Sequence, residues 1–267
     1  MDKYTIFNLT TDETHVLYIH EIFDLIRQRP ECEYYKLVND KPVLIHNETV
    51  LNTEFICHRI NTVEELRNIP PMFGVELDLR DGEYNQLYLQ HDPYIRGGCE
   101  CFGVFFRSDS GKTLTQEFES YLKSYNHKTM ILNIKSERIE PRCIELMNEY
   151  EIQTYFFLDS NLPMIYLLNS KYHNTNIACR FSEFEPIEGY RRIKHMITWV
   201  WCDCFTFQPL TRDIYDEIQT DGKKICIVSP ELQGRAHDIQ KHRDHFIEKG
   251  VLPDAICCKM TNIIHWI

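Results

Sequence analysis

In the segment EFICHR, residues 54 to 59, a mostly apolar run ends in a histidine and an arginine side by side. Short runs of β-branched and aromatic residues are typical of buried strands. Seven further runs of this kind follow along the chain: GVELDL (74–79), TMILNIK (129–135), TYFFLD (154–159), NIACR (176–180), WVWCD (199–203), KICIVS (224–229) and AICCK (255–259). The sequence therefore predicts eight strands.

Helical patterns lie between most of these strands, with apolar residues three or four positions apart. They cover Leu114 to Tyr125, Pro141 to Glu149, Arg212 to Ile218 and Ala236 to Glu248. Thr113 and Pro141 are predicted helix starts, and Gly250 is a predicted stop. This alternation predicts an α/β fold, the (β/α)8 TIM barrel, whose usual length is roughly 250 residues. The alternative is a doubly wound open sheet, which usually has fewer strands and a glycine-rich turn after the first one.

Residues 1–52 stand outside this alternation, so we expect an N-terminal extension, followed by a barrel domain over residues 53–267. Within the extension, Thr14 to Arg29 has the pattern of an amphipathic helix. Tyr34 to Val38 and Pro42 to Ile45, on either side of Asn39-Asp40, predict a hairpin.

The composition excludes several classes of protein. A net charge of −11 without a run of Lys or Arg argues against nucleic acid as a partner, because that needs a clustered basic surface. No apolar stretch near the N-terminus is long enough for a signal peptide or a spanning helix, so we expect a soluble, cytoplasmic protein without an integral membrane segment.

The 11 cysteines are odd in number and lie largely in the apolar runs, as expected for reduced core thiols. The one-residue spacing of Cys99/Cys101 and Cys202/Cys204 does not match the CxxC pairs of zinc sites.

Polar residues end all eight predicted strands, and in a TIM barrel the carboxyl ends of the strands build the active site. A polar residue at the end of one strand is explained by exposure to solvent, but polar residues at the ends of all eight strands favour a shared functional site. These residues are His58 and Arg59, Glu76 and Asp78, Asn133 and Lys135, Asp159, Arg180, Asp203, Ser229, and Lys259.

Glu76 and Asp78 are two positions apart on one strand, so they point to the same face. Two carboxylates on one face repel each other unless a cation lies between them. Oxygen ligands suit Mg²⁺ or Ca²⁺, with water or a substrate phosphate completing the shell. The alternative is that Arg59 or Lys135 neutralises the acid pair in a structural ion pair.

The segment LYLQHDP, residues 87 to 93, has a short apolar alternation that predicts a strand folding back beside the second barrel strand. This would bring His91 to the same mouth as His58. Two imidazoles beside a phosphate would supply a general base and a general acid near neutral pH.

In order and spacing, His58-Arg59, Glu76-Leu77-Asp78, His91-Asp92 and Asn133-Ile134-Lys135 resemble the glycerophosphodiester phosphodiesterases of the PLC-like phosphodiesterase barrel superfamily. The resemblance runs from about residue 54 to the end of the sequence. It implies a TIM barrel that hydrolyses small phosphodiesters, in many relatives through a cyclic phosphate.

The same resemblance implies roles for individual residues. His58 and His91 would be the acid/base pair, and Glu76 and Asp78 would hold a divalent metal, Mg²⁺ or Ca²⁺, with Asn133 where a further carboxylate ligand is usual. Arg59 and Lys135 would contact the phosphate, and the substrate pocket would also be lined by Asp159, Arg180, Trp201 and Asp203. Two positions depart from the family pattern: Ile60 replaces the glycine of His-Arg-Gly, and Asn133 replaces a carboxylate.

Three functions are compatible with these residues. The first is a metal-dependent phosphodiester hydrolase acting on a glycerophosphodiester or a related small phosphodiester. The second is a catalytically weak or inactive barrel that binds phosphorylated head groups, which Asn133 and Ile60 favour. The third is an isomerase or aldolase that uses Lys135 as a Schiff base, which we rank last because Lys135 accompanies an acid pair.

Overall fold

The computed structural model describes all 267 residues except 9, 39, 83–85, 93–94, 98–104 and 108–115. Eight parallel strands form its centre, and each of the eight predicted runs supplies one of them. They are β5 (Glu54–Cys57), β6 (Gly74–Asp81), β11 (Met130–Ile134), β12 (Tyr155–Leu158), β13 (Ala178–Phe181), β14 (Trp199–Cys202), β15 (Lys224–Val228) and β16 (Ala255–Cys258).

The parallel strands pair in the order β12-β11-β6-β5-β16-β15-β14-β13. Strands that are neighbours in the sheet are thus neighbours in chain order, apart from the β16–β5 pair that joins the last strand to the first. A doubly wound sheet reverses its strand order at a switch point, so the pairing excludes that alternative. At the two ends of this order, β12 and β13 are joined by one isolated parallel bridge, between Phe157 and Ile177.

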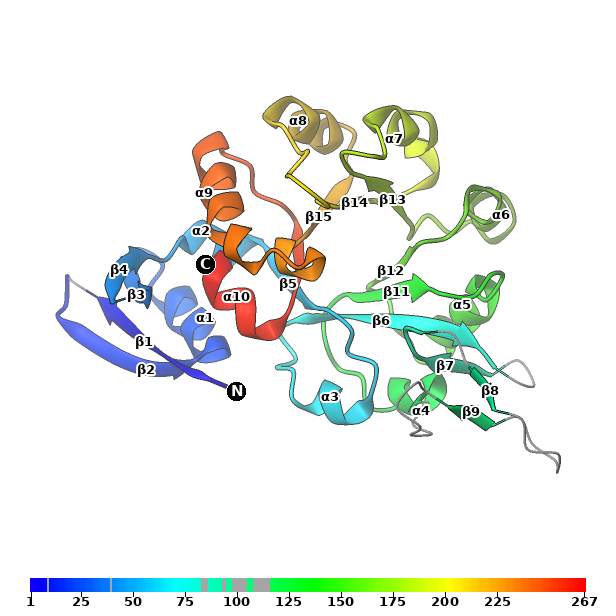
Figure 1. Ribbon diagram of the computed structural model, residues 1–267, viewed down its shortest axis with the longest axis horizontal. Helices are drawn as coiled ribbons and strands as arrows, with labels where there is room; N and C mark the ends of the chain where they lie inside the picture. The colour runs from blue at the N-terminus through cyan, green and yellow to red at the C-terminus, as the bar shows by residue number, and fades with distance from the viewer. Residues whose placement is uncertain (9, 39, 83–85, 93–94, 98–104, 108–115) are drawn as a thin grey trace.

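The predicted α/β alternation is confirmed, and Figure 1 shows helices outside the strands. The helices that follow the strands are α3 (Val63–Arg67), α4 (Phe118–Leu122), α5 (Glu140–Glu149), α6 (Leu162–Tyr172), α7 (Ile187–Ile193), α8 (Arg212–Thr220), α9 (Ile239–Lys249) and α10 (Ile263–Trp266). Pro141 lies in the first turn of α5, and Gly250 ends α9 with φ of +62°, both as predicted.

Two predicted helices differ from the observed ones. The segment from Ala236 begins with a 3-10 turn, Ala236–Asp238, before α9 starts at Ile239. The predicted helix from Leu114 to Tyr125 is represented by the five residues of α4. Its predicted start at Thr113 lies outside the described residues, as do Cys99 and Cys101.

The N-terminal residues form a four-stranded antiparallel sheet of order β2-β1-β3-β4. Its elements are β1 (Lys3–Asn8), β2 (Glu13–Tyr18), β3 (Tyr34–Val38) and β4 (Lys41–Leu44), with helices α1 (Ile19–Gln28) and α2 (Asn47–Asn52). The predicted hairpin is confirmed as β3 and β4, although Asn39 lies outside the described residues.

The predicted helix from Thr14 to Arg29 is wrong in its first third. Residues 14 to 18 belong to β2, which pairs with β1 from Lys3↔Tyr18 to Asn8↔Glu13. The β-branched and aromatic residues of this segment fit a pleated, half-buried surface, and pairing with β1 overrides the helical spacing of the apolar residues. The helix begins only at Ile19, where the carboxylate of Glu21 accepts the N–H of Tyr18 at 2.7 Å.

One hydrophobic core joins the N-terminal sheet to the parallel strands. Phe23 of α1 packs edge-on against Phe55 of β5 and against Phe73, with ring centroids 5.7 and 5.4 Å apart. Lys36 of β3, which is buried, donates to the carbonyl oxygens of Ile264 and Ile267. The N-terminal sheet and the last helix, α10, are therefore in contact (Figure 1). The domain boundary between residues 52 and 53 stays a prediction.

Cysteines of the strands are buried with free thiols, as the sequence predicts: Cys57, Cys179, Cys226, Cys257 and Cys258. In the described part of the chain, no helix has the length and apolar character needed to cross a membrane.

His242 on the buried face of α9 gives a test of this packing through the pH dependence of stability. Burial, together with the nearby Arg235, lowers the pKa of His242 to about 4, whereas in the unfolded chain it is about 6.5. As pH falls through 6.5 the unfolded state takes up a proton here that the folded state takes up only near pH 4. The stability that His242 contributes is therefore present above pH 6.5 and is lost between 6.5 and 4.

The free energy of unfolding should decrease from pH 7 to pH 4 by about 1 to 2 kcal/mol less in His242→Gln than in the wild type. Denaturant unfolding of both proteins at several pH values measures this difference. His237→Gln is the control, because His237 is 80% exposed on the neighbouring turn. Equal pH slopes for wild type and His242→Gln would refute the account.

Candidate active site

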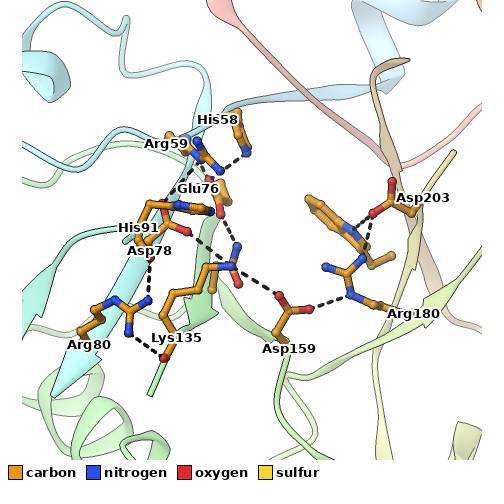
Figure 2. A network of polar contacts seen from close by, with 12 residues as sticks. His58, Arg59, Glu76, Asp78, Arg80, His91, Lys135, Asp159, Arg180 and Asp203 are labelled. Atoms are coloured by element: carbon orange, nitrogen blue, oxygen red, sulfur yellow. Dashed lines mark hydrogen bonds and ion pairs between the residues drawn. The ribbon is translucent and has the colours of Figure 1, made fainter. Parts of the chain in front are cut away.

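The carboxyl ends of the parallel strands surround a pocket of about 180 Å³. Ten of the eleven predicted site residues line it, drawn from strands and turns far apart in the sequence: His58, Arg59, Glu76, Asp78, His91, Asn133, Lys135, Arg180, Trp201 and Asp203. The eleventh, Asp159, joins the same network through Lys135 and Arg180. In Figure 2 the labelled side chains of this set, among them His58, Lys135 and Arg180, point toward one another from different strands.

The floor of the pocket is the acid pair of β6. Glu76 and Asp78 are both buried, and Asn133 stands opposite Asp78 in the parallel register of β11 against β6. The Asn133 amide donates to Glu76 Oε1 at 2.7 Å, and the Arg59 N–H donates to Oε2 at 2.8 Å. Burial first, and then the charge of Asp78, raise the pKa of Glu76 to about 7. The two carboxylates therefore carry unfavourable negative charge that a cation would relieve.

Two oxygens of this floor fit a metal ion. Asp78 Oδ1 and Asn133 Oδ1 are buried and have no hydrogen-bond partner among the described residues. An unsatisfied buried acceptor costs about 1 to 3 kcal/mol. Two carboxylates and an amide oxygen on adjacent strands are a donor set that suits a hard divalent cation, with water or substrate oxygens completing the shell. The described residues contain no group of three or more His, Cys, Asp or Glu side chains that could hold a metal, so an ion here would rest on the two carboxylates and the Asn133 amide oxygen.

The cations nearest to the acid pair are held loosely. Lys135 Nζ lies 3.6 Å from Asp78 Oδ1 and 3.5 Å from Asp159 Oδ2, and Arg59 Nε lies 3.9 Å from Asp78 Oδ2. Charge-assisted hydrogen bonds are about 2.7 to 2.9 Å long. At these distances neither cation donates a direct hydrogen bond to the acid pair, so each keeps N–H groups that can contact an anion in the pocket.

Arg180 behaves differently and forms a fixed wall. Its Nε lies 2.7 Å from Asp159 Oδ1 and its Nη1 lies 2.8 Å from Asp203 Oδ2. Asp203 also accepts from Trp201 Nε1 at 3.4 Å and from Gln233 at 2.9 Å. Because both ion pairs are short, Arg180 is fixed between the two carboxylates and this network shapes the wall of the pocket.

His58 stands at the end of β5 with its Nε2 atom 3.8 Å from Glu76 Oε2. Burial, and then the charge of Arg59, lower the pKa of His58 to about 4. The imidazole is therefore neutral near pH 7, which is the state a proton acceptor needs.

His91 reaches the pocket as the sequence predicts. Strand β7 (Leu87–Leu89) pairs antiparallel with the end of β6, with Leu89 opposite Leu79. The Nδ1 atom of His91 lies 2.7 Å from Asp92 Oδ1. When Nδ1 donates its proton to Asp92, Nε2 is the ring atom left to exchange a proton with a ligand.

The departure at Ile60 has a structural explanation. The left-handed residue of this turn is Arg59, with φ of +56°, and Ile60 is not among the described residues with positive φ. The Ile60 N–H donates to the Glu76 carbonyl at 2.9 Å, and its side chain packs on the core. A glycine is therefore not required at position 60 for the turn that presents His58.

Three residues outside the predicted set also build the site. The side-chain amide of Asn61 donates to Asp78 Oδ2 at 2.9 Å, and Asn61 Oδ1 accepts the backbone N–H of Asp78 at 2.8 Å. Arg80 donates to the carbonyls of His91 at 2.7 Å and Lys135 at 3.1 Å, so it fixes both backbones. Arg80 could have been predicted, because it continues the alternation of Glu76 and Asp78 along β6. Gln233 could not, because it lies in a turn after β15, where side chains do not alternate as in a strand.

Two strand-end residues do not join the site, and here the expectation that all eight ends share it is wrong. Ser229 is buried, donates to Glu231 and accepts from Trp266 Nε1 at 2.7 Å. The Lys259 N–H donates to Glu231 Oε1 at 3.1 Å. Glu231 thus ties these two strand ends to the fold, and neither residue lines the pocket.

No protein-family model matches the sequence, and no curated protein matches it significantly. Solved structures match the fold. A glycerophosphodiester phosphodiesterase from Agrobacterium tumefaciens is 14% identical with a TM-score of 0.52, covering 77% of this chain and 96% of its own. An Oleispira antarctica phosphodiesterase, solved with its product sn-glycerol-3-phosphate, is 13% identical with a TM-score of 0.53, covering 78% and 93%.

A glycerophosphoryl diester phosphodiesterase from Parabacteroides distasonis is 12% identical with a TM-score of 0.54, covering 96% of this chain and 90% of its own. At these identities the likeness establishes the fold, so the chemistry must be argued from the pocket.

Proposed function

We propose that this chain, which has the fold of glycerophosphodiester phosphodiesterases, is a metal-dependent phosphodiester hydrolase built on a closed (β/α)8 barrel whose seam is the β12–β13 bridge. Its substrates would be glycerophosphodiesters or related small phosphodiesters, and its setting the cytoplasm. The observation that carries the proposal is a single pocket that combines two histidines, a buried acid pair and two loosely held cations. This set meets each need of phosphodiester hydrolysis: charge neutralisation, proton removal and proton donation.

In the proposed mechanism the phosphate lies against Lys135 and Arg59, whose positive charges stabilise its equatorial oxygens. Neutral His58 accepts the proton of the attacking hydroxyl, from a neighbouring substrate group or from water. His91 delivers a proton from Nε2 to the oxygen of the leaving alcohol, while Asp92 holds its ring. The Arg180 network keeps the pocket in shape.

Glu76, Asp78 and the Asn133 amide would hold the divalent ion, Mg²⁺ or Ca²⁺. When bound, it would supply positive charge next to the phosphoryl oxygens and lower the cost of the second negative charge that develops there.

Metal removal tests this proposal directly. We expect hydrolysis of glycerophosphoethanolamine in Mg²⁺ or Ca²⁺ to fall at least about a hundredfold when EDTA is added, and to return when the ion is restored in excess. Titration calorimetry with the ion alone gives a second readout, in which Asp78→Asn should weaken binding at least about tenfold. Full turnover in EDTA would contradict the metal assignment.

One observation favours the second candidate, a barrel that binds phosphorylated head groups without turnover. Asn133 brings no charge to the floor, and its amide occupies Glu76 Oε1 at 2.7 Å. A protein that binds glycerol phosphate tightly but releases no alcohol from any diester, with or without metal, would select this candidate. Schiff-base chemistry is disfavoured because Lys135 lies between two carboxylates.

A further inference from the structure

The candidate active pocket is too small for a whole organic phosphodiester. Its 180 Å³ compares with roughly 300 to 1,000 Å³ for ordinary ligand sites. Its lining near Lys135 is polar and charged, so it suits the phosphate group. Most of the organic part of a substrate must therefore lie outside this pocket.

A second, shallower cavity of about 520 Å³ adjoins it. The two share Arg180, Asp203 and Gln233, so they meet along the wall formed by β13, β14 and the turn after β15. Phe184 and Phe205 line the second cavity. A ligand whose phosphate lies near Lys135 would pass over the Arg180 wall to reach these rings.

The two rings form an exposed aromatic pair. Phe184 is 69% exposed and Phe205 is 37% exposed, and their centroids are 5.9 Å apart at an angle of 46°. Covering such rings with apolar ligand surface is favourable because it removes both from water. Large exposed aromatics beside a reactive pocket are a common sign of ligand recognition.

Hydrogen bonds hold the backbone that carries both rings before any ligand arrives. Glu183 accepts the N–H groups of Phe205 at 3.2 Å and Phe207 at 3.3 Å, together with the Thr206 hydroxyl at 2.7 Å. Ser182 Oγ accepts the Phe184 N–H at 3.2 Å. Because the loops are already ordered, a ligand that binds between them loses little free energy in ordering them.

The charged side chains of this cavity already have hydrogen-bond partners within the fold. Arg180 is bound to Asp159 and Asp203, and Glu185 accepts from the Ser182 hydroxyl at 2.8 Å. The two rings are then the exposed apolar surface that the cavity offers to a ligand. We infer that this cavity binds an apolar arm of the substrate, so that the preferred diester carries an alkyl or acyl chain on its alcohol. The inference rests on the proposed function, because it assigns the substrate class of that site.

The experiment compares the glycerol phosphodiesters of ethanol, hexanol and choline as substrates of the wild-type chain and of three variants. We expect the wild type to prefer the hexyl ester over the ethyl ester. Phe184→Ala and Phe205→Ala should each lower the hexyl-to-ethyl ratio of kcat/KM about tenfold. The matched control is Phe207→Ala, which removes a ring of 59% exposure from the same loop but outside this cavity. Its ratio should stay within twofold of wild type.

Two results would overturn the inference: equal kcat/KM for the hexyl and ethyl esters in the wild type, or a choline preference that Phe184→Ala abolishes. The latter would mean that the rings recognise a quaternary ammonium group.

Failure of the proposed function looks different, since no ester is then hydrolysed. In that case the affinity of hexyl phosphate, measured by calorimetry, still tests the aromatic pair: loss of about tenfold in Phe184→Ala but not in Phe207→Ala supports the apolar subsite, and equal affinities refute it.

Discussion

Replacing His58 or His91 with alanine is expected to lower kcat for glycerophosphodiester hydrolysis at least about a hundredfold in each case, the usual scale for a lost general base or acid. His58 is held neutral by burial and by Arg59, so its removal takes away the proton acceptor near the acid pair. His91 is oriented by Asp92 at 2.7 Å, so its removal takes away the group that faces the leaving alcohol. Steady-state kinetics at several pH values measure both losses.

His237→Ala is the matched control for these variants, because its side chain is 80% exposed and it lies away from the pocket. It should retain kcat within about twofold, as expected for surface substitutions away from a site. Thermal unfolding of all three variants separates loss of chemistry from loss of fold. If either His58→Ala or His91→Ala turns over at a near-normal rate while folded, the two-histidine assignment is wrong.

The double substitution adds information about how the two histidines work. Groups that act in the same step give strongly non-additive losses. If His58 and His91 act as base and acid of one step, the double variant should be only slightly slower than the slower single variant. Fully multiplied losses would place them in separate steps.

The strand pattern was predictable because buried parallel strands must be apolar throughout, and each such run stands out against polar surroundings. The site was predictable for a related reason. Glu76 and Asp78, like Asn133 and Lys135, interrupt apolar runs with the period of two that belongs to one strand face. A charged residue inside a buried strand costs free energy unless it has a partner, so it marks either a functional site or a structural contact such as that of Lys36 in β3.

The misses lie where the local pattern has several solutions. Residues 14 to 18 have apolar spacing that suits a helix, but their β-branched and aromatic character let them pair with β1. Asn61 and Gln233 act through partners on other strands, so their roles depend on tertiary contacts that no spacing encodes. Ser229 ends a strand like the site residues do, but its neighbour Glu231 binds it into the fold.

Gly74→Ala is expected to destabilise the fold by about 3 kcal/mol, or roughly 6 to 10 °C in Tm, because a Cβ at the start of β6 would lie 2.6 Å from the backbone oxygen of Thr129 and 2.8 Å from Glu54 Oε1. Neither can retreat cheaply: the Thr129 carbonyl accepts the Val75 N–H at 2.9 Å, and Glu54 accepts the Thr129 N–H at 2.8 Å. Glycine here lets β5, β6 and β11 approach at the base of the strands, and so sets the position of Glu76 two residues later.

The same substitution at Gly189 of α7, where nothing lies within 4 Å of the new Cβ, should instead stabilise the fold by up to about 1 kcal/mol. Opposite signs in thermal unfolding are the signature of this packing. A Gly74→Ala variant as stable as wild type would mean that the three strands do not meet as closely as these contacts require.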